Sequence, residues 1–244
     1  MRTTNPVLNA KTFANVQRVA GVPTMTLEGT INRTAFLLLI LVATATWTWM
    51  EAFIGSPING YLWAGLLGGL AVGMVTVFVP GIARFTAPVY AALEGLALGA
   101  ISAFYEATFH GIVMQAVALT FGVLIALLIV YRLRVIPVTQ NFKLGVCAAT
   151  GAIALFYLLA IGLQAFAGVH IGMLHEGTPL GIAFSLFVIT IASLNLVLDF
   201  DFIEQGIEQG APKQMEWYAA FGLIVTLIWL YVAILRLLSK LRNR

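Results

Sequence analysis

The sequence predicts an all-α integral membrane protein with about seven transmembrane helices, and three observations lead to that fold class. Of the 244 residues, 61% are hydrophobic and 9% are charged, whereas soluble domains carry about 25% charged residues. The mean hydropathy of +0.97 requires that lipid or neighbouring helices surround most side chains. Seven stretches that are almost free of acids and bases each approach the roughly 20 residues that cross a bilayer.

Turn-forming residues separate the predicted spans, which cover residues 34–53, 61–79, 87–108, 112–131, 144–167, 179–198 and 217–238. Glycine and proline mark the breaks at residues 55–60, 80–81 and 177–179. Because the connections are short, adjacent spans should run antiparallel in one bundle. We therefore expect a cytoplasmic tail over residues 1–31, a single seven-helix domain over residues 32–238 and a short basic tail over residues 239–244.

Basic residues alternate between the connections and predict the orientation of the chain. They occur in the second, fourth and sixth connections and in the N-terminal tail, and are missing from the other connections. Cytoplasmic connections are enriched in Lys and Arg, so the N-terminus is expected in the cytoplasm. The C-terminal end disagrees, because seven spans place it outside although it carries Arg236, Lys240, Arg242 and Arg244. Either the last apolar stretch is re-entrant, or it crosses because upstream spans fix the topology; its length favours crossing.

Small residues recur every fourth position in two of the spans. The second span contains Gly65, Gly69 and Gly73, and the third contains Gly95 and Gly99 between Ala91 and Ala103. Such stripes allow the backbones of transmembrane helices to approach closely. We expect these two spans to pack tightly on each other or on a neighbouring helix.

Glu94 is the most conspicuous ionisable residue within a predicted span. An acid near a helix centre costs at least about 2.5 kcal/mol in a membrane, so it suggests a function. Arg84 lies ten residues upstream, about 15 Å along a helix, so the partner of Glu94 is expected from another span or from water. Two interpretations stay open, namely a proton or cation site and a silent hydrogen bond between helices.

A second polar group closes the sixth span. Asn195 and Asp199 are four residues apart and share one helix face, so Asp199 is expected to point inward. Asp201 lies on a different face and is expected at a wet surface. With Glu204, Glu208 and Glu216 it would make the sixth connection acidic, which would attract cations to a pore mouth or serve no transport role.

Several functional classes lack their signatures. The sequence contains no Gly-x-Ser-x-Gly, His-Glu-x-x-His, phosphate-loop or dinucleotide-binding motif, so we expect no enzyme activity and no cofactor. The single cysteine, Cys147, and the three histidines, His110, His170 and His175, give no convincing metal site. The basic residues are scattered and form no stripe, so no nucleic-acid partner is expected.

The residues APVYAALEGLALG at 87–99 and LDFDFI at 198–203, together with the seven-span profile, resemble the bacterial branch of the Bax inhibitor-1 (transmembrane Bax inhibitor motif) family. The resemblance implies six helices around a central seventh, a bacterial inner membrane, and a pH-sensitive calcium leak controlled by two aspartates that share a proton. Asp199 is similar to the family aspartate of the sixth span. The seventh span has no acid where the second is expected, and Thr226 is nearest to that position.

Two hypotheses about function follow from this resemblance. In the first, the protein is a pH-sensitive leak channel for calcium or another cation, with a pathway along Asp199, Glu94, Asp201 and Asn195. One of Asp201, Glu94 and Glu204 would then have to replace the missing aspartate. In the alternative, the protein conducts nothing and regulates a membrane-bound ATP-dependent protease or another helical partner, which the missing aspartate favours.

Overall fold

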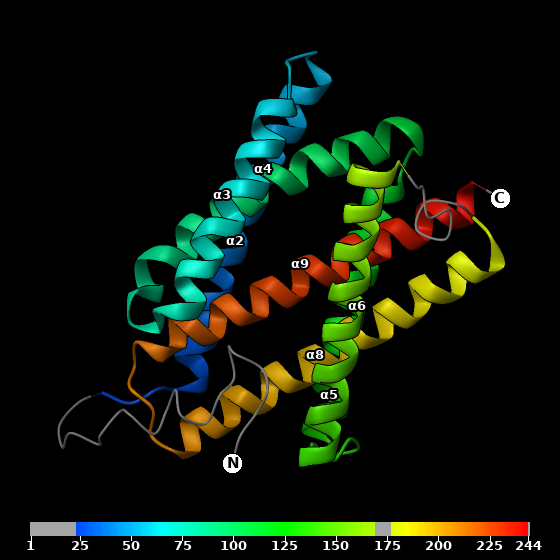
Figure 1. Ribbon diagram of the computed structural model, residues 1–244. Helices are drawn as coiled ribbons and strands as arrows, with labels where there is room; N and C mark the ends of the chain where they lie inside the picture. The colour runs from blue at the N-terminus through cyan, green and yellow to red at the C-terminus, as the bar shows by residue number, and fades with distance from the viewer. Residues whose placement is uncertain (1–22, 169–176, 244) are drawn as a thin grey trace. The chain divides into compact units, whose positions relative to one another are not determined.

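The computed structural model describes residues 23–168 and 177–243, and within these ranges seven helices are long and apolar enough to span a membrane (Figure 1). They are α2 (Leu27–Phe53), α3 (Asn59–Phe78), α4 (Ala83–Thr108), α5 (Ile112–Arg132), α6 (Gln140–Ala167), α8 (Pro179–Glu208) and α9 (Met215–Arg242), with a short 3-10 helix, η1 (Pro80–Ile82), before α4. This confirms the all-α membrane fold class. The arrangement of six helices around a central seventh stays a prediction.

Helix α2 begins at Leu27, within the region expected as the N-terminal tail. Thr26 caps the helix, because its side chain accepts a hydrogen bond from the Gly29 amide at 3.0 Å. Glu28 in the first turn complements the positive end of the helix dipole. Residues 27–31 are therefore helical, and the part of the expected tail that covers residues 1–22 lies outside the described residues.

The last two helices are longer than their predicted spans. Helix α8 continues past residue 198 to Glu208, so Asp199, Asp201 and Glu204 lie on the helix instead of in a connection. Helix α9 continues to Arg242, so residues 239–242 extend the helix where a tail was expected. At 1.5 Å per residue, the 28 residues of α9 measure about 42 Å, which favours a complete crossing over a re-entrant segment.

The chain divides into two compact units, and the division falls within the sequences of α8 and α9. The first unit contains residues up to Thr108 together with Asp199–Val225, and the second contains Phe109–Leu198 together with the residues from Thr226 onward. The single transmembrane domain expected over residues 32–238 stays a prediction.

In the first unit, α4 packs against both α2 and α3 (Figure 1). Glycines make this packing possible: Gly65 of α3 approaches the backbone of α4 at Leu93, and Gly99 of α4 approaches the backbone of α2 at Ala45. The start of α9 joins the same unit through Phe221, whose ring lies edge-on to Tyr90 of α4 at 4.9 Å between centroids.

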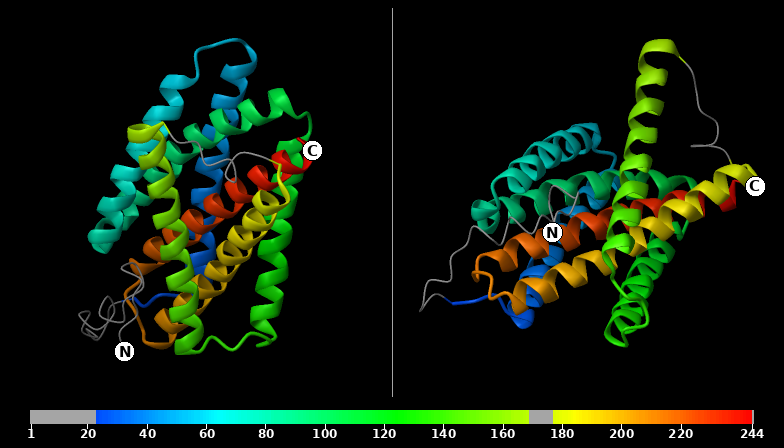
Figure 2. Two further views of the ribbon diagram at one scale, coloured as in Figure 1. Left: turned by 45° about the vertical axis from the view of Figure 1, so that its right-hand side comes forward. Right: turned by 60° about the horizontal axis from the view of Figure 1, so that its bottom comes forward.

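In the second unit, α6 crosses α8 and α9 (Figure 2), and the three helices share an apolar core. Its buried residues are Ile153, Val188, Ile191 and Ala233, and Phe184 packs beside them. Helix α5 joins this unit at its beginning, where Arg242 of α9 donates to the Gln115 side chain at 3.1 Å.

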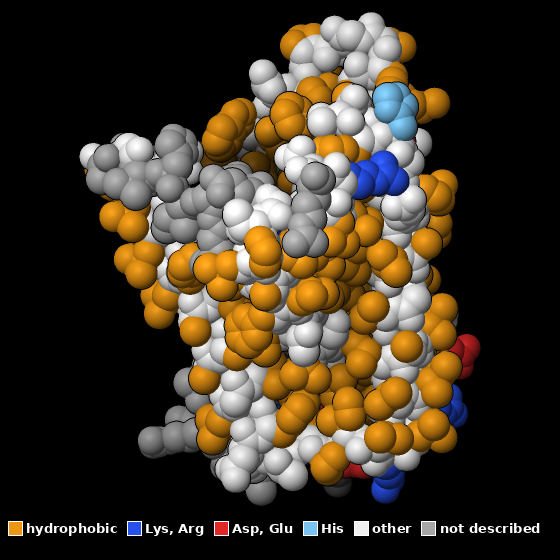
Figure 3. All heavy atoms as spheres, turned by 90° about the vertical axis from the view of Figure 1, so that its right-hand side faces the viewer, with side chains coloured by type: hydrophobic (Ala, Val, Ile, Leu, Met, Phe, Trp, Pro, Cys, Tyr) orange, Lys and Arg blue, Asp and Glu red, His pale blue; other side chains and the backbone are white. Residues whose placement is uncertain are grey.

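Hydrophobic side chains dominate the exposed surface, and charged side chains are sparse on the face in Figure 3. Leu67 on α3, Ile125 on α5 and Leu159 on α6 are all more than half exposed. Large apolar side chains in such positions fit a lipid environment, in which their exposure costs nothing.

Candidate functional site

Asp199 lies on α8 at the edge of the first unit, close to the backbone of α9. The residue is half-buried, and its Oδ2 atom is closed to solvent. A Cβ atom on Gly222 of α9 would lie 3.9 Å from Asp199 Oδ1. Because glycine has no side chain, the Asp199 carboxylate lies directly beside the backbone of α9 at Gly222.

The seventh helix carries no second aspartate. Glu216 is the only acidic residue of α9, in its first turn, and Thr226, at the position where the family aspartate is expected, is 8% exposed. Of the three candidate replacements, Asp201 accepts a hydrogen bond from Gln205 one turn further along α8. Glu204 is exposed, and Glu94 lies on α4. All three candidates lie on α8 or α4, so none of them is an acid of the seventh helix.

Glu94 is half-buried at the seam between α4 and α3. A Cβ atom on Gly69 would lie 2.5 Å from Glu94 Oε1, so the glycine of α3 makes the room that this carboxylate occupies. The Tyr90 hydroxyl, one turn earlier on α4, donates a hydrogen bond to Glu94. The expectation that the partner comes from another span or from water missed Tyr90, although its spacing of four residues places it on the same helix face.

The two glycine stripes serve different pairs of helices. On α3, Gly65 faces Leu93 and Gly73 faces the ring of Tyr90, both on α4. On α4, Gly95 faces Leu41 and Thr44 of α2 instead of α3. Helix α4 thus packs against α3 with one face and against α2 with another.

Asn195 connects two helices of the second unit. Its Nδ2 atom donates to Thr150 Oγ1 of α6 at 2.8 Å and to the Ile191 carbonyl oxygen at 2.8 Å. Asn195 and Asp199 lie one turn apart on the uninterrupted helix α8. The amide of Asn195 therefore links α8 to α6. The sequence suggested Asn195 for an ion pathway and did not predict this link.

Replacing Thr150 by valine is expected to destabilise the protein by about 1 kcal/mol, since hydrogen bonds between transmembrane helices contribute about that much. Valine keeps the shape of threonine and removes the acceptor of Asn195. Chemical unfolding in lipid micelles measures the loss. Thr190→Val is a matched control, because the Thr190 side chain is exposed and its hydroxyl donates to the Leu186 carbonyl of its own helix. An equal loss in both variants would contradict the assignment.

Glu216 corrects one expectation about the acidic connection. Instead of contributing to a wet acidic surface, its side chain is fully buried. Glu216 Oε1 accepts hydrogen bonds from the Thr26 amide at 3.1 Å and the Thr26 hydroxyl at 3.0 Å, and Oε2 lies 3.9 Å from Arg33 Nε. Its distance from Thr26 along the chain hid this pairing from sequence analysis.

The basic residues at the end of α9 also differ from a solvated tail. Arg236 donates to the Tyr157 hydroxyl of α6 at 2.7 Å, and Lys240 is 2% exposed. Lys240 Nζ donates to the Gly181 carbonyl at 3.1 Å and to Ser185 Oγ of α8 at 3.0 Å. Arg236 and Lys240 are therefore bound by side chains and backbone of the second unit.

No group of three or more His, Cys, Asp or Glu side chains suited to a metal occurs in the described ranges. His110 is exposed between α4 and α5, where its carbonyl oxygen accepts a hydrogen bond from Arg242 at 2.6 Å. His170 and His175 lie outside the described residues.

Seven apolar helices within the described ranges, with the acids Glu94 and Asp199 at their seams, define a polytopic helical membrane protein. A family model described as Bax inhibitor 1 like matches residues 5–243, nearly the whole chain. The chain therefore belongs to the Bax inhibitor 1 like family. No curated protein and no solved structure matches it.

Proposed function

We propose that this protein is a pH-sensitive leak channel for calcium or another cation, without enzyme activity, in a bacterial inner membrane. Its membership of the Bax inhibitor 1 like family supports the proposal. The observation on which the proposal depends is the position of Asp199, whose carboxylate lies half-buried in an apolar unit beside the bare backbone of α9 at Gly222. The alternation of basic residues supports a cytoplasmic N-terminus.

The proposed gate acts through the charge of Asp199. An ionised carboxylate among apolar helices favours water or a cation beside it, whereas a protonated one lets the helices close. Glu94 supplies a second polar site within the helices, at the seam of α3 and α4. Asp201 lies nearer to the connection and adds negative charge at the pathway's mouth, and Asn195 fixes α8 on α6.

Calcium flux into liposomes that contain the purified protein tests this proposal. We expect wild-type flux to vary between about pH 5 and pH 8, and Asp199→Asn to reduce that variation to less than about twofold, because asparagine cannot titrate. Glu94→Gln should lower the flux at every pH. Glu208→Gln is the control, since this exposed carboxylate lies at the end of α8. Unchanged pH dependence in Asp199→Asn would remove Asp199 from the gate.

The second candidate function is a non-conducting protein that regulates a membrane-bound ATP-dependent protease or another helical partner. Thr226 favours it, because a buried hydroxyl stands where the pH gate of the family is expected to have a second carboxylate. Absence of flux at every pH, with a protease recovered in a fixed ratio from native membranes, would support this function over the channel.

A further inference from the structure

The residues that precede α2 are attached to the connection between α8 and α9. Thr24 and Pro212 form an antiparallel bridge. The Met25 amide donates to the Ala211 carbonyl at 2.7 Å, and the Lys213 amide donates to the Pro23 carbonyl at 2.9 Å. Residues 23–26, here called the strap, therefore lie across this connection.

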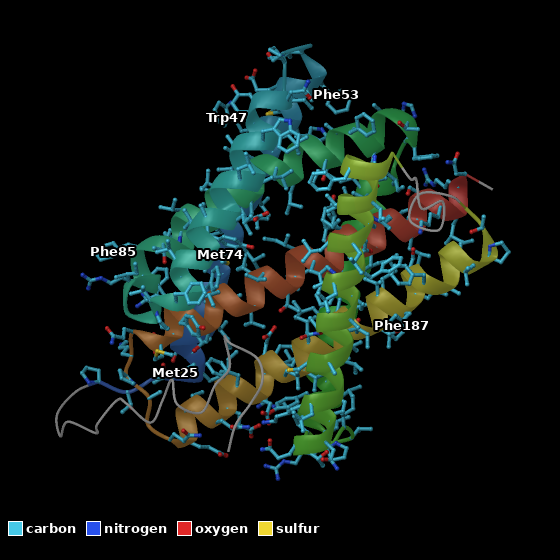
Figure 4. The ribbon with its side chains drawn as sticks, viewed as in Figure 1. Met25, Trp47, Phe53, Met74, Phe85 and Phe187 are labelled. Carbon is cyan, nitrogen blue, oxygen red and sulfur yellow. The ribbon has the colours of Figure 1, made fainter. Side chains whose placement is uncertain are left out.

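The strap covers an apolar surface. Met25 is 2% exposed, although Pro23, Thr24 and Thr26 around it are exposed. On the other side of the bridge, Ala211 and Met215 are also buried. Figure 4 shows Met25 at the start of α2, beside the first turns of α9. A segment that buries one side chain and exposes its neighbours has few contacts with the rest of the unit.

Glu216 fastens the strap from the first turn of α9. Its Oε1 atom accepts both hydrogen bonds from Thr26, and α2 passes so close that a Cβ atom on Gly29 would collide with the Glu216 carboxylate. Arg33, also on α2, faces Glu216 Oε2 at 3.9 Å and lies over the Trp217 ring at 4.7 Å. Among the described residues, neither Glu216 Oε2 nor Arg33 Nε has a hydrogen-bond partner, so Thr26 makes the directional contacts.

We propose that residues 23–26 are a strap that closes the α8–α9 connection and that Glu216 is the latch that holds it. Release of the latch lifts Met25 and opens the first turns of α9 to water. Gly222, which lies beside Asp199, is less than two turns beyond Glu216 on α9. Release of the latch would also let water and cations reach Asp199, a consequence that rests on the proposed function; the closure of the connection does not rest on it.

Thiol labelling in lipid nanodiscs, where both faces are accessible, tests the closure without any flux measurement. With Cys147 replaced by alanine, Ala219→Cys serves as the reporter, because Ala219 is 3% exposed and lies one turn beyond Met215. We expect Glu216→Gln and Thr26→Val to accelerate its reaction with a water-soluble maleimide by at least about tenfold, since local opening exposes it. Glu208→Gln is the matched control, an exposed acid near the same connection.

Two further variants separate local opening from loss of folding. Ala100→Cys on α4, where Ala100 is 2% exposed, should stay unreactive in the latch variants. A disulfide between Thr24→Cys and Pro212→Cys, whose bridged positions suit its geometry, should restore slow labelling of Ala219→Cys in Glu216→Gln. Labelling of Ala219→Cys at the wild-type rate in folded Glu216→Gln, or equal acceleration at Ala100→Cys, would overturn the proposal.

Discussion

Replacing Gly95 by alanine is expected to destabilise the protein by about 3 kcal/mol or more, because forced overpacking of a close contact is costly. A Cβ atom at this position would collide with the Leu41 carbonyl and the Thr44 hydroxyl of α2. The collision with Leu41 involves backbone, which cannot turn aside as a flexible side chain can. Helices α2 and α4 would have to separate, and denaturant unfolding in lipid micelles would measure the loss.

Gly122→Ala on α5 is the control for Gly95→Ala. Nothing lies within 4 Å of a Cβ atom at Gly122, and alanine favours a helix over glycine by about 1 kcal/mol. The stability of this variant should therefore be unchanged or higher. A similar loss in both variants would show that close packing of α4 on α2 is not what Gly95 provides.

Replacing Lys240 by glutamate is expected to cause the other large loss of stability, about 3 kcal/mol or more, as when a buried charge loses its partners. The Lys240 ammonium is buried and donates to the Gly181 carbonyl and the Ser185 hydroxyl. A carboxylate cannot donate to the carbonyl, and it would bring a negative charge to the negative end of the α9 dipole. Denaturant unfolding of the purified protein provides the measurement.

Two further variants separate the effect of the Lys240 charge from the effect of its packing: Lys240→Met and Arg242→Glu. Methionine keeps the apolar stem, and Ser185 still donates to Gly181 at 2.9 Å, so a loss below about 1.5 kcal/mol is expected for a swap that conserves volume. Arg242 is exposed, so reversing its charge should cost much less than Lys240→Glu. If Lys240→Glu were as stable as Lys240→Met, a negative charge at this buried site would cost nothing, and the prediction would be wrong.

The sequence predicts the helices well, because the length and hydropathy that a bilayer demands are local properties. All seven predicted spans coincide with helices of the described ranges. The errors occur at the ends: α8 and α9 run on through charged residues, since hydrogen bonds along a helix continue past the edge of an apolar stretch. A window that excludes charges cannot detect those extra turns.

The candidate site is only partly visible in the sequence. The acids Glu94 and Asp199 are identifiable because charge is costly inside a membrane, and the glycines of α3 and α4 are identifiable by their spacing. Which helix faces each glycine stripe is not, since Gly95 packs on α2 and Gly69 packs against Glu94. The spacing of the glycines shows that they share one face of a helix, but it does not show which helix packs on that face.

Composition and local hydropathy are enough to predict an all-α membrane protein with about seven spans, because they show which segments are stable in lipid and which in water. The contacts of the charged residues near the helix ends depend instead on how the chain folds. Glu216 meets Thr26 from 190 positions away along the chain, and Lys240 meets Ser185 from 55 positions away. Contacts over such separations depend on how the helices fold back on one another, which no local pattern records.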